Sequence, residues 1–178
     1  LRAGLDLTTA REKALVAERV EEAARLLPVE DLEILGFWAW RDGLSRGFAA
    51  HHAGMLPPFK EAVEDLFAAG ALKAVFATET LALGINMPAR SVVIEKLVKF
   101  NGENHVDITP GEYTQLTGRA GRRGIDVEGH AVVMWRPGLD PAAVAGLASR
   151  RTYPLRSSFR PTYNMSANLL AQVGAEPV

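Results

Sequence analysis

The chain has 178 residues, a size typical of one domain with a buried core. Apolar residues make up 48% of the chain and charged residues 23%, which is typical of a globular protein and excludes a disordered one. The net charge of −1 excludes nucleic-acid binding through bulk positive charge, so any such contact must be local.

Several classes of chemistry are also excluded. The chain has no cysteine, which rules out disulfides, thiolate metal sites and cysteine nucleophiles. No apolar run approaches the roughly 18 residues of a membrane span. The charged residues Arg2, Asp6, Arg11 and Glu12 interrupt any signal peptide at the start of the chain. We therefore expect a cytoplasmic protein.

Helices and strands alternate along the chain. Thr9 and Glu12 have the spacing of a capping box, and apolar residues follow at helical spacing as far as Leu27. A second helix is expected from about Val29 to Leu44. The remaining expected elements are an extended segment at 47–51, a helix at 57–70, strands at 72–77 and 91–95, a polar loop at 100–110, a helix from 110 through 120, a strand at 129–135 and a helix at 141–148.

This alternation predicts an α/β fold with an open, mostly parallel sheet and helices on both faces. Because the chain begins with a helix and has few strands for its helix content, we expect a first strand to lie outside this sequence. Proline and serine become frequent from Arg150 onward, which predicts a linker. A further helix is expected to begin near Tyr163 and to run to Val173.

The segment Gln115–Gly124 (QLTGRAGRRG) carries the most specific signal. We expect Gln115, Arg119 and Arg122 to share one helical face, because they are spaced i, i+4, i+7. Guanidinium groups are planar, permanently charged and bidentate toward phosphate. The interleaved glycines would let a phosphate approach closely. A solvated basic helix end is the alternative, but the glycines argue against it because they weaken a helix.

The segment Ala77–Pro88 (ATETLALGINMP) follows a predicted buried strand. Ligands of open α/β sheets bind at the carboxyl ends of strands, so Thr78 and Thr80 are candidates for phosphate contacts. Gly84 would allow close backbone approach, and Asn86 could bond a ribose hydroxyl or a neighbouring loop. A simple strand-to-helix turn with a threonine N-cap explains the segment equally well.

The third segment is His51–Met55 (HHAGM). Adjacent histidines on a strand point to opposite sides, and no third ligand lies at a standard spacing, so we expect no metal site. We expect His51 to make an internal hydrogen bond and His52 to contact a nucleic-acid backbone.

The chain holds no G-x-x-x-x-G-K-[ST] phosphate loop and no acidic D-E-x-H cluster that would bind magnesium. The chain therefore has arginines suited to binding phosphate but no loop that would hold one. This combination predicts a phosphate-binding site that is split between this chain and another domain.

In this order and spacing, the three segments resemble motifs IVa, V and VI of superfamily 2 DExH helicases, in the superkiller and exosome-helper branch of RNA helicases. The segment SFRPTYNM at 158–165 resembles the family's connection into a winged-helix domain. The resemblance implies that residues 1–150 form a second RecA-like domain without its first strand. Residues 151–178 would be a linker and the start of the winged-helix domain.

The resemblance also implies an ATP-dependent helicase, with ATP and Mg²⁺ bound mainly by a preceding RecA-like domain. Arg119 and Arg122 would reach the phosphates, with Arg122 as the arginine finger, and Gln115 would couple the nucleotide to the domain interface. Gly84 and Asn86 would lie near the ribose. The isolated chain is expected to be inactive.

On the nucleic-acid side, the resemblance implies sequence-independent contacts with an RNA backbone. Thr78 would contact a phosphate with Glu79 and Thr80 in support, and His52 and Gly54 would lie near the backbone. A DNA-repair helicase domain and a non-catalytic nucleic-acid-binding module remain alternatives, because phosphate contacts carry no information on the type of nucleic acid.

Overall fold

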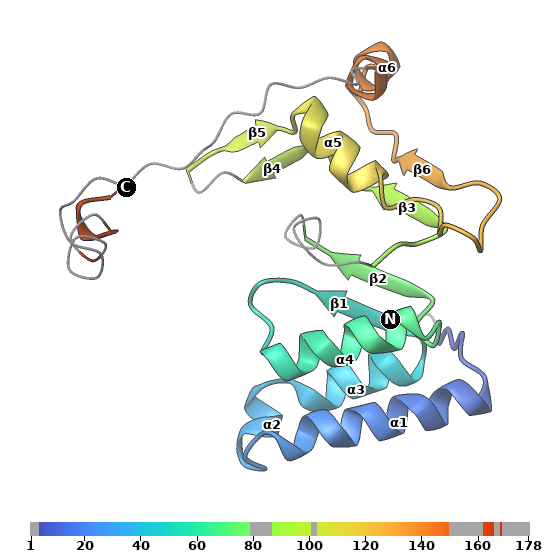
Figure 1. The fold of residues 1–178 in the computed structure, drawn as a ribbon, viewed down its shortest axis with the longest axis vertical. Helices are drawn as coiled ribbons and strands as arrows, with labels where there is room; N and C mark the ends of the chain where they lie inside the picture. The colour runs from blue at the N-terminus through green and yellow to red at the C-terminus, as the bar shows by residue number, and fades with distance from the viewer. Residues whose placement is uncertain (1–3, 79–86, 101–102, 150–161, 166–167, 169–178) are drawn as a thin grey trace, which may run out of the picture.

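The structure is a computed structural model that describes residues 4–78, 87–100, 103–149, 162–165 and 168 (Figure 1). Helices and short, mainly parallel strands alternate along it, as predicted. In the described part, no helix is long and apolar enough to cross a membrane.

The first helix, α1 (Ala10–Arg25), begins at the predicted capping box. The backbone N–H of Glu12 donates to the Thr9 hydroxyl at 3.3 Å, and the Glu12 carboxylate accepts from the Thr9 N–H at 2.8 Å. Lys73 also pairs with this carboxylate and, together with the Thr9 bonds, lowers the pKa of Glu12 to about 2. The start of α1 is therefore tied to a segment far along the chain.

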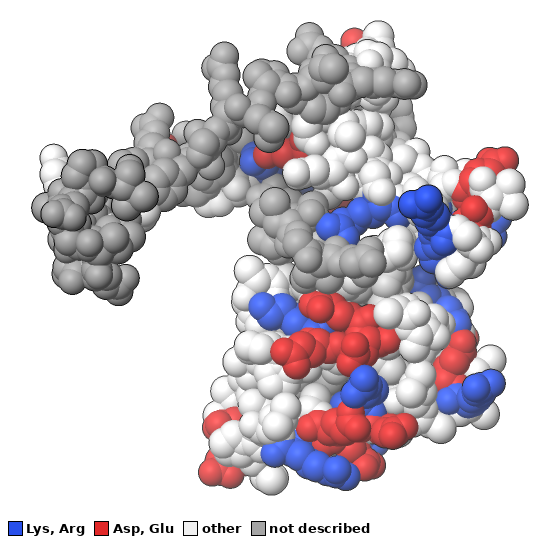
Figure 2. All heavy atoms as spheres, viewed as in Figure 1, with Lys and Arg blue, Asp and Glu red and all other residues white. Residues whose placement is uncertain are grey.

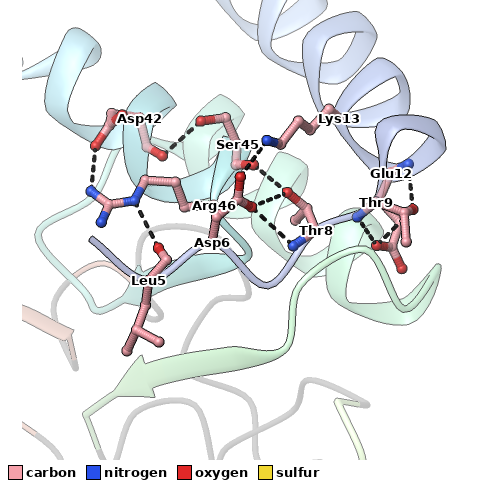
Figure 3. A network of polar contacts seen from close by, with 9 residues as sticks. All are labelled: Leu5, Asp6, Thr8, Thr9, Glu12, Lys13, Asp42, Ser45 and Arg46. Carbon is pink, nitrogen blue, oxygen red and sulfur yellow. Dashed lines mark hydrogen bonds and ion pairs between the residues drawn. The ribbon is translucent and has the colours of Figure 1, made fainter. Parts of the chain in front are cut away.

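A second polar network fixes the residues that precede α1 (Figure 3). The Thr8 hydroxyl donates to the Ser45 carbonyl at 2.6 Å, and the Arg46 Nε–H donates to the Leu5 carbonyl at 2.9 Å. Asp6 pairs with Lys13, whose hydrogen bond is the main cause of a lowered Asp6 pKa, about 2. These contacts hold the chain start against the end of a later helix.

That later helix is shorter than predicted. Instead of one helix from Val29 to Leu44, the structure has two, α2 (Asp31–Ile34) and α3 (Phe37–Ser45). Gly36 separates them in a left-handed conformation with φ of 68°, a conformation that an uninterrupted helix cannot contain. The helical spacing of the apolar residues did not reveal this break.

The first pair of strands lies against these helices. β1 (Phe48–His51) and β2 (Ala74–Ala77) pair in parallel, and α4 (Pro57–Ala68) connects them. Apolar side chains of α1, α3, α4 and the segment after α4 form the larger core, whose most buried members are Val16, Leu44, Val63, Leu66 and Ala71.

The second half of the chain forms a separate, smaller core. β3 (Ser91–Ile94) and β6 (His130–Val133) pair in parallel. Helices α5 (Pro110–Thr117) and α6 (Pro141–Ser149) belong to this half. Its buried residues are Ile94, Ile108 and Tyr113.

A short antiparallel hairpin lies where the sequence predicted a polar loop. β4 (Val98–Phe100) pairs with β5 (His105–Asp107). Each strand of the hairpin is only three residues long, shorter than the runs of roughly 4–8 residues by which strands are recognised in sequence.

Among the described strands, the predicted single sheet is not continuous. β1–β2 and β3–β6 are separate two-stranded sheets, so β2 and β3 are each paired along one edge only. Figure 1 shows α1 to α4 grouped with β1 and β2, and α5 and α6 grouped with β3 to β6.

Candidate nucleotide and nucleic-acid site

The helix that carries Gln115 ends earlier than predicted. α5 begins at a capping box formed by Thr109 and Glu112, and it ends at Thr117. Gln115 is exposed on this helix, whereas Arg119 and Arg122 lie beyond its C-terminal cap. The prediction of one helical face shared by all three side chains is therefore wrong, as is the prediction that the helix continues to residue 120.

The backbone beyond α5 ends the helix because it pairs with another segment. The N–H of Ala89 donates to the Arg119 carbonyl at 3.0 Å, and the N–H of Gly121 donates to the Ala89 carbonyl at 2.8 Å. Ala120 thus forms a parallel bridge with Ala89, two residues before β3. Tertiary pairing of this kind overrides local helical spacing.

Glycines in this segment have a packing role that the sequence did not reveal. Gly121 has a φ of 91°, which suits glycine. A Cβ added to Gly129 would lie 2.4 Å from the Ala120 carbonyl carbon and from the Gly121 nitrogen. Close contact between the two backbones therefore explains these glycines, and they do not by themselves indicate phosphate approach.

Arg122 is held by Asp126 within its own turn. Its Nε–H donates to Asp126 Oδ2 at 2.8 Å, its Nη2–H donates to Oδ1 at 2.8 Å, and its backbone N–H donates to Oδ2 at 2.9 Å. The hydrogen bond between the side chains raises the pKa of Arg122 and holds the pKa of Asp126 well below its usual range. The positive charge of Arg90 lowers the Asp126 pKa further.

To reach a phosphate supplied by another domain, Arg119 and Arg122 must both extend outward from this domain, and the structure meets this requirement in part. The Arg122 side chain is engaged in the ion pair, yet it is 40% exposed, whereas the Asp126 side chain is 8% exposed. Arg119 is half-buried. Figure 2 shows basic side chains gathered between the part that carries β1 and β2 and the part that carries β3 to β6.

A second group of candidate residues follows the carboxyl ends of β1 and β2. The N–H of Thr78 donates to the His51 carbonyl at 3.2 Å, which ties the two strand ends together. The His51 side chain is buried, and its Nε2 lies 2.8 Å from Glu64 Oε1. His52 and Thr78 are exposed. The two histidines therefore point to opposite sides, and His51 makes an internal hydrogen bond, as predicted.

The turn after β1 places His52 beside Gly54. The N–H of Met55 donates to the His52 carbonyl at 3.1 Å, and a Cβ added to Gly54 would lie 3.3 Å from His52 Nδ1. This turn borders a shallow pocket of about 360 Å³, which is also lined by Lys60, Glu61 and Glu64. Because carboxylates outnumber ammonium groups in this lining, the pocket by itself does not suit a phosphate.

The two groups lie at different ends of their strands. Thr78 and His52 follow the carboxyl ends of β2 and β1, whereas the segment 119–121 pairs with Ala89, two residues before β3. The predictions for Glu79, Thr80, Gly84 and Asn86 fall outside the described residues.

Sequence reasoning missed three residues that shape these groups, namely Arg90, Asp126 and Glu64. Asp126 had a detectable signal, because it follows Arg122 at the i, i+4 spacing of ion pairs. Glu64 had none, since its partner lies on a different element.

Comparison with known proteins identifies the class of this domain. Residues 5–124 match the model of the helicase conserved C-terminal domain. The chain belongs to this family, and its fold is RecA-like.

Three relatives show which helicases this chain is similar to. The chain is 65% identical over 176 residues to the probable helicase HelY of Mycobacterium tuberculosis, covering 99% of this chain and 19% of the relative. It is 43% identical over 166 residues to the human exosome RNA helicase MTR4, covering 93% of this chain and 16% of the relative. It is 40% identical over 168 residues to the antiviral helicase SKI2 of Saccharomyces cerevisiae, covering 94% of this chain and 13% of the relative.

These relatives confirm the predicted resemblance to the superkiller and exosome-helper branch of superfamily 2 DExH helicases. The chain spans about a fifth or less of the length of the relatives it matches.

The contact between Gly129 and residues 120–121 gives a stability prediction. Gly129→Ala should destabilise the chain by about 2–3 kcal/mol, because its Cβ would overlap main-chain atoms that cannot rotate away. Gly146→Ala is the matched control, since no atom lies within 4 Å of the added Cβ. In helix α6 alanine should stabilise by roughly 0.5–1 kcal/mol. Urea denaturation of both variants measures the difference, and equal midpoints would contradict the packing role.

Proposed function

We propose that this domain is part of an ATP-dependent RNA helicase and supplies the arginine side of a split ATP site. The observation that carries the proposal is the Arg122 guanidinium, which is fixed in a turn outside any helix and remains partly exposed. The chain holds no phosphate loop of its own, so a preceding RecA-like domain would bind most of the ATP and its Mg²⁺. The names of the relatives support RNA as the nucleic acid.

The chemistry of phosphoryl transfer explains why such a site would be divided. An arginine finger stabilises the charge on the transferring phosphoryl group and contributes a factor of about 10³–10⁵ in rate. If the finger comes from a second domain, hydrolysis occurs only when the cleft between the domains is closed. Arg119 would contact the phosphates beside Arg122, and Gln115 would couple the nucleotide to the interface. Gly84 and Asn86 would lie near the ribose.

The ends of β1 and β2 would hold the nucleic-acid backbone. Thr78 and His52 are exposed beside these ends, and the bond between Thr78 and His51 fixes their spacing. Glu79 and Thr80 would support Thr78, and Gly54 would allow close approach. Hydroxyl and backbone donors to phosphate carry no base information, so binding would not depend on sequence.

The division of the sheet suggests how the domain is completed. Among the strands that the structure describes, β2 and β3 are each paired on one edge only, and both sheets are parallel. We propose that an additional parallel strand, from a segment of the parent protein outside residues 1–150, lies between β2 and β3. Residues 151–178 would form the linker and the start of a winged-helix domain.

The arginine finger is tested by Arg122→Ala in the full-length parent. ATP hydrolysis should fall by at least about 10³-fold, because the transferring phosphoryl group loses its charge stabilisation. RNA binding should change little. Arg25→Ala is the control, since Arg25 is an exposed arginine of α1 in a weak ion pair with Glu21. Normal steady-state ATP hydrolysis by the Arg122 variant would show that Arg122 is not an arginine finger.

The nucleic-acid contacts are tested by the double variant Thr78→Ala, His52→Ala of the parent. Its affinity should fall by roughly 5- to 150-fold, because two hydrogen bonds of about 0.5–1.5 kcal/mol each are lost. The loss should be similar for poly(A) and poly(U) in fluorescence anisotropy. His105→Ala, an exposed histidine of β5, is the control. Unchanged affinity would refute the placement, and tighter binding to single-stranded DNA than to RNA would favour the DNA-repair alternative.

The inserted strand is tested by hydrogen exchange. In the isolated chain, the amides of β2 and β3 that are not bonded to β1 or β6 should exchange quickly. In the full-length parent they should exchange at least about tenfold more slowly, because a neighbouring strand would accept their hydrogen bonds. The amides of α4 serve as the internal control. Equally fast exchange of the β2 and β3 amides in both proteins would exclude the strand.

A further inference from the structure

We infer that Asp126 is a positioning residue for the ATPase reaction, which sets the direction in which the Arg122 guanidinium meets a phosphate. The inference rests on the proposed function of Arg122. It goes beyond that function because it assigns a role to a carboxylate that would touch neither the nucleotide nor the nucleic acid.

The geometry uses one edge of the guanidinium. Asp126 accepts from Nε and from one hydrogen of Nη2, both at 2.8 Å. The opposite edge, formed by Nη1 and the second Nη2 hydrogen, points away from the carboxylate. A planar guanidinium can bind a carboxylate on one edge and a phosphate on the other, because its donors lie in a fixed fork. The ion pair therefore orients Arg122 without consuming its capacity to bind phosphate.

The two side chains of the ion pair differ in burial, with Asp126 as the buried partner and Arg122 as the exposed one. The Asp126 side chain is 8% exposed, and the Arg122 side chain is 40% exposed. The carboxylate lies on the inner side of the pair, and the guanidinium extends from it toward the surface. An exposed arginine without such an anchor would sample many rotamers, and restricting them before the phosphate arrives reduces the entropy lost at that step.

The same carboxylate also fixes the backbone of the turn. The Arg122 N–H donates to Asp126 Oδ2 at 2.9 Å, and the N–H groups of Ile125 and Asp126 donate to the Arg122 carbonyl at 3.0 and 2.9 Å. The backbone N–H and the guanidinium of Arg122 therefore both donate to the Asp126 carboxylate. Since residues 119–121 are paired with Ala89, the guanidinium is fixed relative to the start of β3.

Electrostatics near the pair still favour an anion. Arg90 lies close enough to lower the pKa of Asp126 by its charge. Two arginines around one aspartate leave a net positive charge, so the carboxylate orients Arg122 without cancelling the attraction for a phosphate.

The test compares Asp126→Ala, Asp126→Asn and Asp126→Glu in the full-length parent. Asp126→Ala should lower kcat for ATP hydrolysis by roughly 10- to 100-fold, because a small displacement of a catalytic group costs on this scale. The KM for ATP should change less than about threefold, since the first RecA-like domain would bind most of the nucleotide. Asp126→Asn keeps an acceptor for the Arg122 N–H but loses the charge, so it should retain the turn and still lower kcat. Asp126→Glu, which keeps the carboxylate, should recover part of the loss.

Asp42→Asn is the matched control, because Asp42 also pairs with an arginine four residues away, Arg46, on the remote helix α3. It should leave kcat unchanged. A double-mutant cycle with Arg122→Lys separates positioning from general damage: Asp126→Ala should cost much less in that background, because lysine has no fork to orient.

The outcomes separate the two proposals. If Arg122→Ala turns over normally, the proposed arginine finger fails. If Arg122→Ala is inactive while Asp126→Ala and Asp126→Asn keep kcat within about twofold of the parent, the positioning role alone is overturned. Fully additive losses in the cycle would also overturn it.

Discussion

The arrangement of the candidate nucleotide site depends on one backbone contact, in which residues 119–121 are held between Ala89 and Gly129. Two hydrogen bonds to Ala89 remove this segment from the helical path of α5. The absence of a side chain at Gly129 allows β6 to begin directly beside the segment. Arg122 then falls in a tight turn where a carboxylate four residues later reaches both its backbone and its side chain. Packing of glycine against backbone thereby determines where a charged group is presented.

The sequence predicted most elements of the fold because their signals are local. The capping box at Thr9, the proline start of α4 and the apolar strand that becomes β2 each depend on neighbouring residues only. Three failures, at Gly36, in the β4–β5 hairpin and at the end of α5, have other causes. In the hairpin each strand is only three residues long, too short to give a recognisable run, and after α5 pairing with the distant Ala89 decides the conformation, for which a single sequence carries no signal.

The candidate site shows the same division. The exposure of His52 and the place of Thr78 at the end of β2 were predicted correctly, since both follow from order along the chain. The spatial relation of the other candidates was not, because a helical wheel placed Gln115, Arg119 and Arg122 together when the helix ends before both arginines. Glycines were assigned to phosphate approach although Gly121 lies against Gly129. A motif therefore identified the family more reliably than it identified the reason for each of its residues.

The two candidate groups occupy different ends of the strands, and this separation has a mechanical consequence for a domain of this family. Thr78 and His52 follow the carboxyl ends of β2 and β1, whereas the segment that leads to Arg122 adjoins the amino end of β3. β2 and β3 are not bonded to each other among the described strands, so rigid coupling between the two groups requires an element that joins them. A strand inserted between β2 and β3 would provide it through backbone hydrogen bonds alone, and nucleotide-dependent movement at Arg122 would then be carried to the nucleic-acid contacts as motion of one body.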